Sequence, residues 1–347
     1  MALKEEFDWK LSIKTNILML QIMGLWPRGV KRYKPDFYKF HSTTLTVFIA
    51  SSQNFFQIVK IFFVYQDLEA LTATIFITCT AVLVSVKMYF FTRNGKLLKE
   101  LADMLSSDLF KPVNDKQVHQ VRPILQFWNF FYVVYWIMVC ATVCFWSIVP
   151  FLNQSVKEKE LPFPAWYPYD SKMSPLYELT YFYQVFTIWY LSLAGINMDT
   201  LIAALMMYVG IQCDVLSDNV RNLKTLSDKV GARNVNEVII RCVKQHREII
   251  SFAQKCTQFL NMIALGQFFT STMVITLTMF QLSLVDPLSK ESFSHLFYVS
   301  AITSQIFLYS WFGNEVEIKN TQTSNSSPID DELSIPVFQD TTFNSKS

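Results

Sequence analysis

The feature that most constrains this chain is an uncharged apolar run of about twenty residues near its C-terminal end, from Ser294 to Gly313. In an α-helix, twenty residues extend about 30 Å, which is the thickness of the hydrocarbon core of a bilayer. The run closes on Trp311 and Phe312, an aromatic pair typical of a membrane border, and then on Gly313, a residue that often ends a helix. We therefore expect a membrane-spanning helix here that ends at Gly313.

Further apolar stretches of similar length precede this run. They lie at about residues 43–65, 68–91, 127–151, 178–210 and 259–285. Hydrophobic residues make up 51% of the chain and charged residues only 17%, against about 25% in a typical soluble domain. The sequence predicts an all-α fold, a polytopic helical bundle with about six transmembrane helices in a lipid bilayer. The net charge of +2 gives no reason to expect a nucleic-acid partner.

An amphipathic helix is predicted before the first span, over residues 7–26. Large apolar residues recur on one face of it, at Trp9, Ile13, Ile17 and Leu20. The apolar run is too short for a signal peptide and stops at Pro27, so we expect an uncleaved helix lying on the inner membrane surface. It belongs to a cytoplasmic amphipathic leader, residues 1–42.

The distribution of Lys and Arg predicts the orientation of the spans. Residues 1–42 hold eight, residues 92–126 hold six and residues 211–258 hold eight, whereas the alternate loops hold none, three and one. Because positive charge accumulates in cytoplasmic loops, the N-terminus and the linkers 92–126 and 211–258 are expected inside. The glycosylation pattern at Asn153 then falls outside. An inside N-terminus argues against a G-protein-coupled receptor.

Isolated charges within the predicted spans have simple expected positions. Lys60 and Lys87 lie near span ends, where a lysine extends its ammonium to the interface. Asp199 lies late in a long fourth apolar segment, and we expect it to project into the cytosol. A secondary transporter is a weaker alternative interpretation of the chain, because we find no internal inverted repeat and expect no charged pair at mid-membrane.

Several short motifs occur together in an order that points to one family. Gly24-Leu25-Trp26-Pro27 closes the leader, and His246–Gln254 lies shortly before the fifth span. The most specific motif ends the sixth span and comprises Tyr309, Trp311, Phe312, Gly313, Asn314 and Glu315. Over residues 7–318 the chain resembles the insect odorant receptor family.

The resemblance implies a receptor rather than an enzyme, with no cofactor or metal. Family members are similar to seven-helix, N-inside subunits of ligand-gated cation channels. A tuning subunit of this kind binds a small volatile apolar ligand and assembles with a co-receptor subunit into a heterotetramer. The implied location is the plasma membrane of olfactory sensory neurons, with residues 43–313 forming the transmembrane receptor domain.

The C-terminal segment departs from the family pattern. Residues 314–347 are polar, rich in Ser, Thr and Asn, and contain no run long enough to span a membrane. We expect a disordered cytoplasmic tail in place of a seventh, pore-lining helix. The alternative interpretation of the chain is therefore a truncated, non-conducting isoform that acts as a membrane interaction or dampening subunit.

Candidate ligand contacts come from the outer halves of the second, third and fourth spans, where aromatic rings and hydroxyls are placed to hold a small apolar molecule. They are Thr74, Thr78, Thr142, Phe145, Trp146, Tyr183, Phe186 and Tyr190, with Tyr298 and Thr303 as vaguer candidates. Aromatic stripes in membrane helices also serve simply for packing. The histidines are scattered, and no catalytic constellation is visible.

Overall fold

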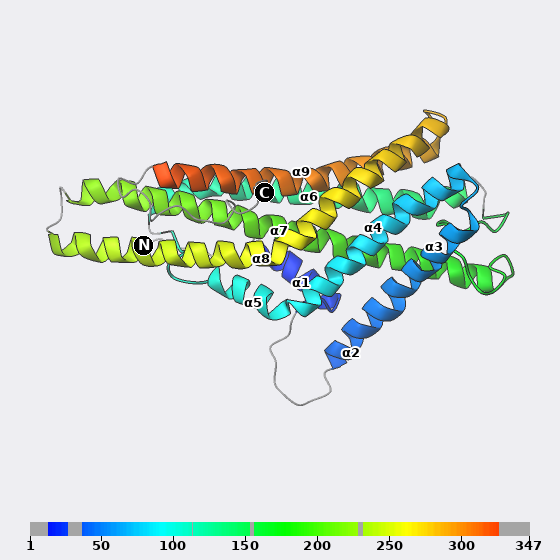
Figure 1. Cartoon of the computed structure of the whole chain (residues 1–347), viewed down its shortest axis with the longest axis horizontal. Coiled ribbons are helices and arrows are strands. Elements are labelled where there is room, and N and C mark those ends of the chain that lie inside the picture. The colour runs from blue at the N-terminus through cyan, green and yellow to red at the C-terminus, as the bar shows by residue number, and fades with distance from the viewer. Residues whose placement is uncertain (1–12, 27–36, 113, 153–155, 228–231, 326–347) are drawn as a thin grey trace, which may run out of the picture.

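The computed structural model describes residues 13–26, 37–112, 114–152, 156–227 and 232–325, and within these ranges all regular secondary structure is helical (Figure 1). In chain order the helices are α1 Lys14–Ile22, α2 Phe37–Thr44, the π-helix η2 Leu45–Ser51, α3 Ser52–Phe63, α4 Leu68–Arg93, α5 Gly95–Met104, α6 Asp115–Leu152, α7 Leu176–Ser227, α8 Ala232–Leu284 and α9 Lys290–Asn325. The predicted all-α class is confirmed.

The long helices run side by side as an elongated bundle (Figure 1). The α3–α4 and α8–α9 turns and the segment 156–175 gather at one end, which we call the loop end. The C-terminal end of α7 and the N-terminal end of α8 lie at the opposite end, which we call the linker end. Any cavity between the helices is therefore bounded by loops on one side and by long helical extensions on the other.

Four helices are long and apolar enough to cross a membrane, by length and composition, within the described part of the chain: Leu68–Arg93, Asp115–Phe151, Leu176–Arg221 and Asn236–Leu284. Within its apolar stretch α7 is 83% buried, against 17% for α6 and 28% for α8. An α-helix that is hydrophobic all round must be covered by its neighbours. α7 is accordingly the central helix of the bundle.

Two predicted spans take a different form. The expected first span, residues 43–65, is divided among α2, η2 and α3, and the wider π-helical turns interrupt its α-helical hydrogen bonding. The expected sixth span lies within α9, which carries Ser, Thr and Gln side chains as well as apolar ones. Neither α9 nor the α2–α3 run is among the four helices that meet the criteria of length and hydropathy.

The prediction that the last helix ends at Gly313 is wrong, because α9 continues to Asn325. Residues 314–325 are therefore helical rather than disordered, and residues 326–347 lie outside the described ranges. An ion pair one helical turn apart, Lys319 Nζ to Glu315 Oε1 at 2.9 Å, supports this extension. Lys319 also reaches Asp214 Oδ2 of α7 at 2.6 Å, which fastens the extended helix to the bundle.

The linkers predicted as separate segments largely continue the long helices. Residues 211–227 extend α7 and residues 232–258 extend α8. Within residues 92–126 the structure has the amphipathic helix α5, with Leu98 and Leu101 buried and Leu105 buried just beyond its end.

The N-terminal helix packs into the protein. Ile13 and Leu20, from the predicted apolar face, are fully buried, and Asn16 donates a hydrogen bond to Thr200 Oγ1 of α7 at 2.5 Å. α1 is therefore docked on the central helix rather than only resting on a membrane surface, because the apolar face finds protein partners. Trp9 and Pro27 lie outside the described ranges, as does Asn153.

Candidate functional site

A cavity of about 80 Å³ lies between α4, α6, α7 and α9. Its wall is mainly apolar, with a few hydroxyl groups and one carboxylate. The lining residues are Ile77, Thr80, Ala81, Val84, Tyr135, Val139, Thr142, Val143, Trp146, Ile188, Leu191, Ser192, Gly195, Ile196, Asp199, Tyr298, Ala301, Ile302 and Gln305. A concave, mainly apolar space with a small number of polar groups is the usual form of a small-molecule site.

Two of the predicted contacts, Thr142 and Trp146, line this cavity, as does the vaguer candidate Tyr298. The Trp146 and Tyr298 rings pack at 4.8 Å between centroids and form part of one wall. Thr303 is exposed and does not contribute to the lining.

The other predicted residues point elsewhere. Thr74 and Thr78 are buried, and their hydroxyls donate to the carbonyls of Ala70 and Thr74 on their own helix. Phe145 stacks on Phe297 at 5.2 Å between centroids, away from the cavity. Phe145 and Trp146 are adjacent on α6, but only Trp146 faces the cavity, whereas Phe145 packs against Phe297 of α9.

The predicted aromatic face of α7 packs against the N-terminal helices. Tyr183 shares a hydrogen bond with Ser52 at 2.5 Å, and Tyr190 donates to the Met23 carbonyl at 3.2 Å. Phe186 is 45% exposed. The stripe thus serves for packing and for the outer surface, and the opposite face of α7, with Ile188, Leu191 and Gly195, lines the cavity.

At the loop end, the segment before α7 folds back onto the cavity wall. Phe163 is buried in a cluster that includes Ile77, Tyr298 and Ile302, and it packs on Trp146 at 5.6 Å. Gln184 of α7 holds Phe163 in place by bonding both of its backbone groups: Phe163 N–H donates to Oε1 at 3.1 Å, and Nε2 donates to the carbonyl at 3.0 Å.

Tyr167 completes this attachment. Gln184 Nε2 donates to its hydroxyl at 3.0 Å. Burial raises the pKa of Tyr167 despite the opposing effect of the Gln184 hydrogen bond, so the phenol stays neutral at physiological pH. The loop is therefore held by neutral hydrogen bonds.

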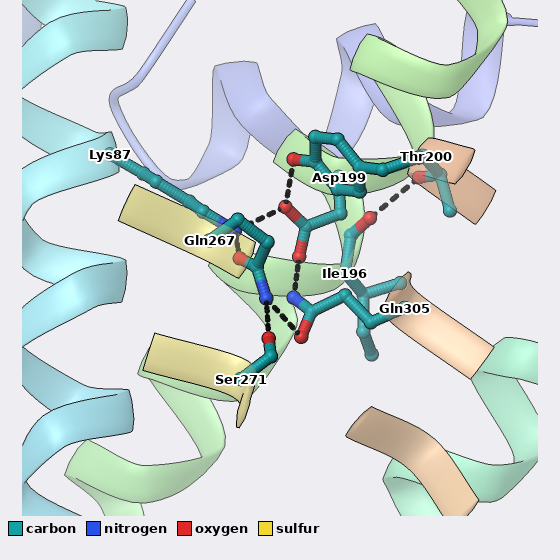
Figure 2. A network of polar contacts seen from close by, with 8 residues as sticks. Lys87, Ile196, Asp199, Thr200, Gln267, Ser271 and Gln305 are labelled. Atoms are coloured by element: carbon teal, nitrogen blue, oxygen red, sulfur yellow. Dashed lines mark hydrogen bonds and ion pairs between the residues drawn. The ribbon is translucent and has the colours of Figure 1, made fainter. Parts of the chain in front are cut away.

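Opposite the loop-end wall, the cavity borders a buried polar network that joins four helices (Figure 2). Lys87 Nζ of α4 lies 2.5 Å from Asp199 Oδ1 of α7 and also donates to Gln267 Oε1 of α8. Gln305 of α9 donates to Asp199 Oδ2, and Tyr309 of α9 donates to Oδ1 at 2.7 Å. We call Lys87, Asp199, Gln267, Gln305 and Tyr309 the polar network.

This network corrects two expectations. Lys87 is only 1% exposed and does not extend to an interface, and Asp199 is fully buried rather than projecting into the cytosol. The chain therefore does contain a charged pair deep in the bundle. Each charge is tolerated there because the other neutralises it and amide and phenol groups satisfy the remaining hydrogen bonds.

A sequence profile of the 7tm odorant receptor family matches residues 67–326. The chain belongs to the insect odorant receptor family. Its relatives include Odorant receptor Or1 of Anopheles gambiae, 23% identical over 90% of this chain and 80% of that protein. Odorant receptor 94a of Drosophila melanogaster is 21% identical, with 90% of this chain and 81% of that protein covered.

The fold agrees with solved structures of an insect olfactory receptor. OR5 from Machilis hrabei in complex with eugenol superposes with a TM-score of 0.79 at 18% identity, covering 91% of this chain and 82% of that one. A second structure of OR5 gives a TM-score of 0.78. This odorant receptor is therefore a helical membrane protein of a receptor family, not an enzyme.

Several residues of the odorant receptor cavity were not expected from the sequence, among them Tyr135, Ser192 and Asp199. The expected contacts came from the outer halves of the spans, whereas the cavity extends to the polar network. A signal was present in the sequence, because an Asp and a Lys within apolar runs are costly unless they pair.

Proposed function

We propose that this chain is an odorant receptor tuning subunit that binds a small volatile molecule and gates a cation channel together with a co-receptor subunit. The observation that carries the proposal is the cavity bounded by α4, α6, α7 and α9. It is mainly apolar, its loop-end wall packs on Phe163, and the polar network borders it. OR5, a protein of the same fold, has been determined in complex with the small aromatic molecule eugenol.

The polar network suggests how occupancy of the cavity would reach the rest of the bundle. Asp199 and Gln305 belong both to the cavity wall and to the network, so a ligand that displaces either side chain alters contacts on all four helices. Coupling of this kind requires an element with two arrangements that the ligand favours unequally. We infer that this element is the contact between α9 and α7, which would change when the two helices move relative to each other. The proposed assembly is a heterotetramer in the plasma membrane of olfactory sensory neurons, with the N-terminus inside.

The test is a cation current in cells that express this chain with a co-receptor, recorded across a panel of small volatile molecules. We expect responses to one-ring or short-chain ligands. Trp146→Ala removes a large part of the cavity wall and should shift the half-maximal concentration at least tenfold. Phe182→Ala is the matched control, because Phe182 is 72% exposed and lies outside the cavity lining.

Absence of current with every ligand, despite surface expression, would contradict the channel function. Ligand binding without current would instead favour the rival function, a non-conducting interaction or dampening subunit. Equal effects of Trp146→Ala and Phe182→Ala would show that the ligand binds outside this cavity.

A further inference from the structure

Two hydroxyl groups in the cavity differ from the others in their bonding. The hydroxyls of Thr142 and Thr80 donate to carbonyls one helical turn back, and the Tyr298 hydroxyl bonds to Thr80 at 2.5 Å. By contrast, no hydrogen bond from the described residues reaches the hydroxyl of Tyr135 or of Ser192, although both residues line the cavity.

The unpaired state of Ser192 is unusual for this bundle. Serines and threonines inside the apolar helices generally donate to the carbonyl four residues earlier, as Ser85 and Ser147 do at 2.9 and 2.8 Å. Tyr135 is only 3% exposed, so its hydroxyl is removed from bulk water, whereas Ser192 is half-buried. A buried hydroxyl without a partner costs free energy that a suitable ligand group recovers.

Helical spacing places Ser192 on the face of α7 that meets the polar network. Ser192 lies seven residues before Asp199, two turns away on the same face of α7, and both line the cavity. Tyr135 lines the same cavity as Asp199 from the facing helix α6. The cavity therefore has an apolar wall toward the loop end and a polar wall beside the network.

The charge of the network determines what this polar wall accepts. Lys87 already neutralises Asp199 at 2.5 Å, so a cationic ligand gains no unpaired counter-ion and an anionic ligand meets a carboxylate. Either charge would lose its hydration without compensation. Tyr135 and Ser192 can each donate and accept, and the compact neutral group that does the same is a hydroxyl.

We propose that Tyr135 and Ser192 form a subsite for the hydroxyl group of a neutral alcohol or phenol, with the hydrocarbon part of the ligand against Trp146 and Ile188. This inference rests on the proposed function, because it assumes that the cavity is the odorant site. It adds a ligand class and two specificity-determining residues, neither of which was among the contacts expected from the sequence.

The experiment compares three isosteric probes: benzyl alcohol, ethylbenzene and benzylamine. Each is tested for current in cells expressing the full chain with a co-receptor, and for thermal stabilisation of the purified full chain. We expect benzyl alcohol to act at roughly tenfold lower concentration than ethylbenzene, the ratio that one additional buried hydrogen bond gives. Benzylamine, which is cationic at neutral pH, should be the weakest of the three.

The variants Tyr135→Phe and Ser192→Ala each remove one hydroxyl and retain most of the side chain. In each, the preference for benzyl alcohol over ethylbenzene should fall several-fold while the ethylbenzene response is kept. Tyr132→Phe is the matched control, because Tyr132 lies on the same helix, packs against Trp128 and Trp136, and does not line the cavity. Because the readout is a ratio within one variant, reduced expression does not imitate the effect.

The outcomes separate the two proposals. Responses to both benzyl alcohol and ethylbenzene with no preference, or a preference that Tyr135→Phe and Ser192→Ala leave intact, overturn the hydroxyl subsite alone. Stabilisation by benzyl alcohol without any current supports the subsite and contradicts the channel function. No current and no stabilisation with any probe overturns the subsite, and the broader odorant panel then decides the proposed function independently.

Discussion

Lys87 and Asp199, 112 residues apart in the chain, form an ion pair of 2.5 Å in which both side chains are withdrawn from solvent. The pair joins α4 to the central helix α7, and the amides of Gln267 and Gln305 extend it to α8 and α9. A buried ion pair contributes little net stability, but removal of either partner is strongly destabilising because it leaves an unpaired charge in the interior. The polar network therefore fixes how four helices meet beside the cavity.

Removing one member of this pair should be costly. Asp199→Asn or Lys87→Met leaves an uncompensated buried charge, and we expect a loss of about 3–5 kcal/mol of stability. The double variant should lose less than the sum of the single variants, because neither charge remains. Thermal unfolding of the purified chain, arranged as a double-mutant cycle, measures this coupling.

The surface pair Lys255–Glu100 is the matched control. It has the same 2.5 Å separation, but its side chains are 28% and 54% exposed. Glu100→Gln should cost no more than about 1 kcal/mol, because solvent screens the pair. Additive effects at Lys87 and Asp199 would show that the ion pair is not the unit of stabilisation.

The glycine of the leader motif should be irreplaceable. Gly24 has φ +80°, and a Cβ at this position would lie 2.7 Å from Ser42 Cα. Gly24→Ala should destabilise the chain by about 1–3 kcal/mol, because it combines a disfavoured backbone with a clash against main chain. Circular dichroism melting of the two proteins tests this.

Gly313 in the other family motif provides the contrast. It is helical, and a Cβ there meets nothing within 4 Å. Gly313→Ala should be neutral or stabilising by up to about 1 kcal/mol, since alanine is the better helix former. Comparable losses at Gly24 and Gly313 would contradict the distinction drawn between them.

Periodicity and composition were enough to predict the helices and the apolar face that carries Ile13 and Leu20, and short motifs were enough to predict the family. They could not predict which face of α7 meets the cavity, because that helix is apolar all round and its rotation depends on packing with α4, α6 and α9. The helical spacing of Tyr183 and Tyr190 predicts ligand contact, but their hydroxyls bond to Ser52 and to the Met23 carbonyl.

The positions of the buried charges could not be predicted from the sequence for a related reason. Lys87 lies near the end of an apolar run, so interfacial placement was the natural expectation, and only the fold brings it to Asp199. Glycine often ends a helix, and the sequence therefore predicts an end at Gly313. The helix continues because ion pairs of Lys319 with Glu315 and Asp214 stabilise the turns beyond it. Long-range partners decide both cases.

Filling the cavity should weaken ligand responses with little effect on the fold. Gly195 lines the cavity, and a Cβ there would make an ordinary contact of 3.5 Å with Val84 Cγ2. We expect Gly195→Ala to fold normally with a weaker ligand response, and Gly195→Leu to raise the half-maximal concentration at least tenfold.

A second helical glycine, Gly266, is the control for this series. A Cβ there would lie 3.6 Å from Leu83 Cδ1, outside the cavity lining. Gly266→Ala should leave the concentration dependence of the current unchanged. An unaltered response in Gly195→Leu would exclude this cavity as the odorant site.

The attachment of the loop by Gln184 should control how long a ligand stays bound. Gln184 is fully buried, and it bonds Phe163 N–H, the Phe163 carbonyl and the Tyr167 hydroxyl. Gln184→Leu keeps the bulk of the side chain but leaves two backbone groups unpaired, at a cost of about 1–3 kcal/mol. The segment should open more often and uncover the cavity wall at Trp146.

Two measurements test Gln184→Leu. Amide hydrogen exchange across residues 160–167 should accelerate while exchange within α7 stays slow, and the current should decay faster after ligand removal. Tyr169→Phe is the control, because it removes only a bond to Thr180 from a side chain that is 40% exposed. Faster exchange with an unchanged decay of the current would mean that ligands leave by another route, between the helices rather than past Phe163.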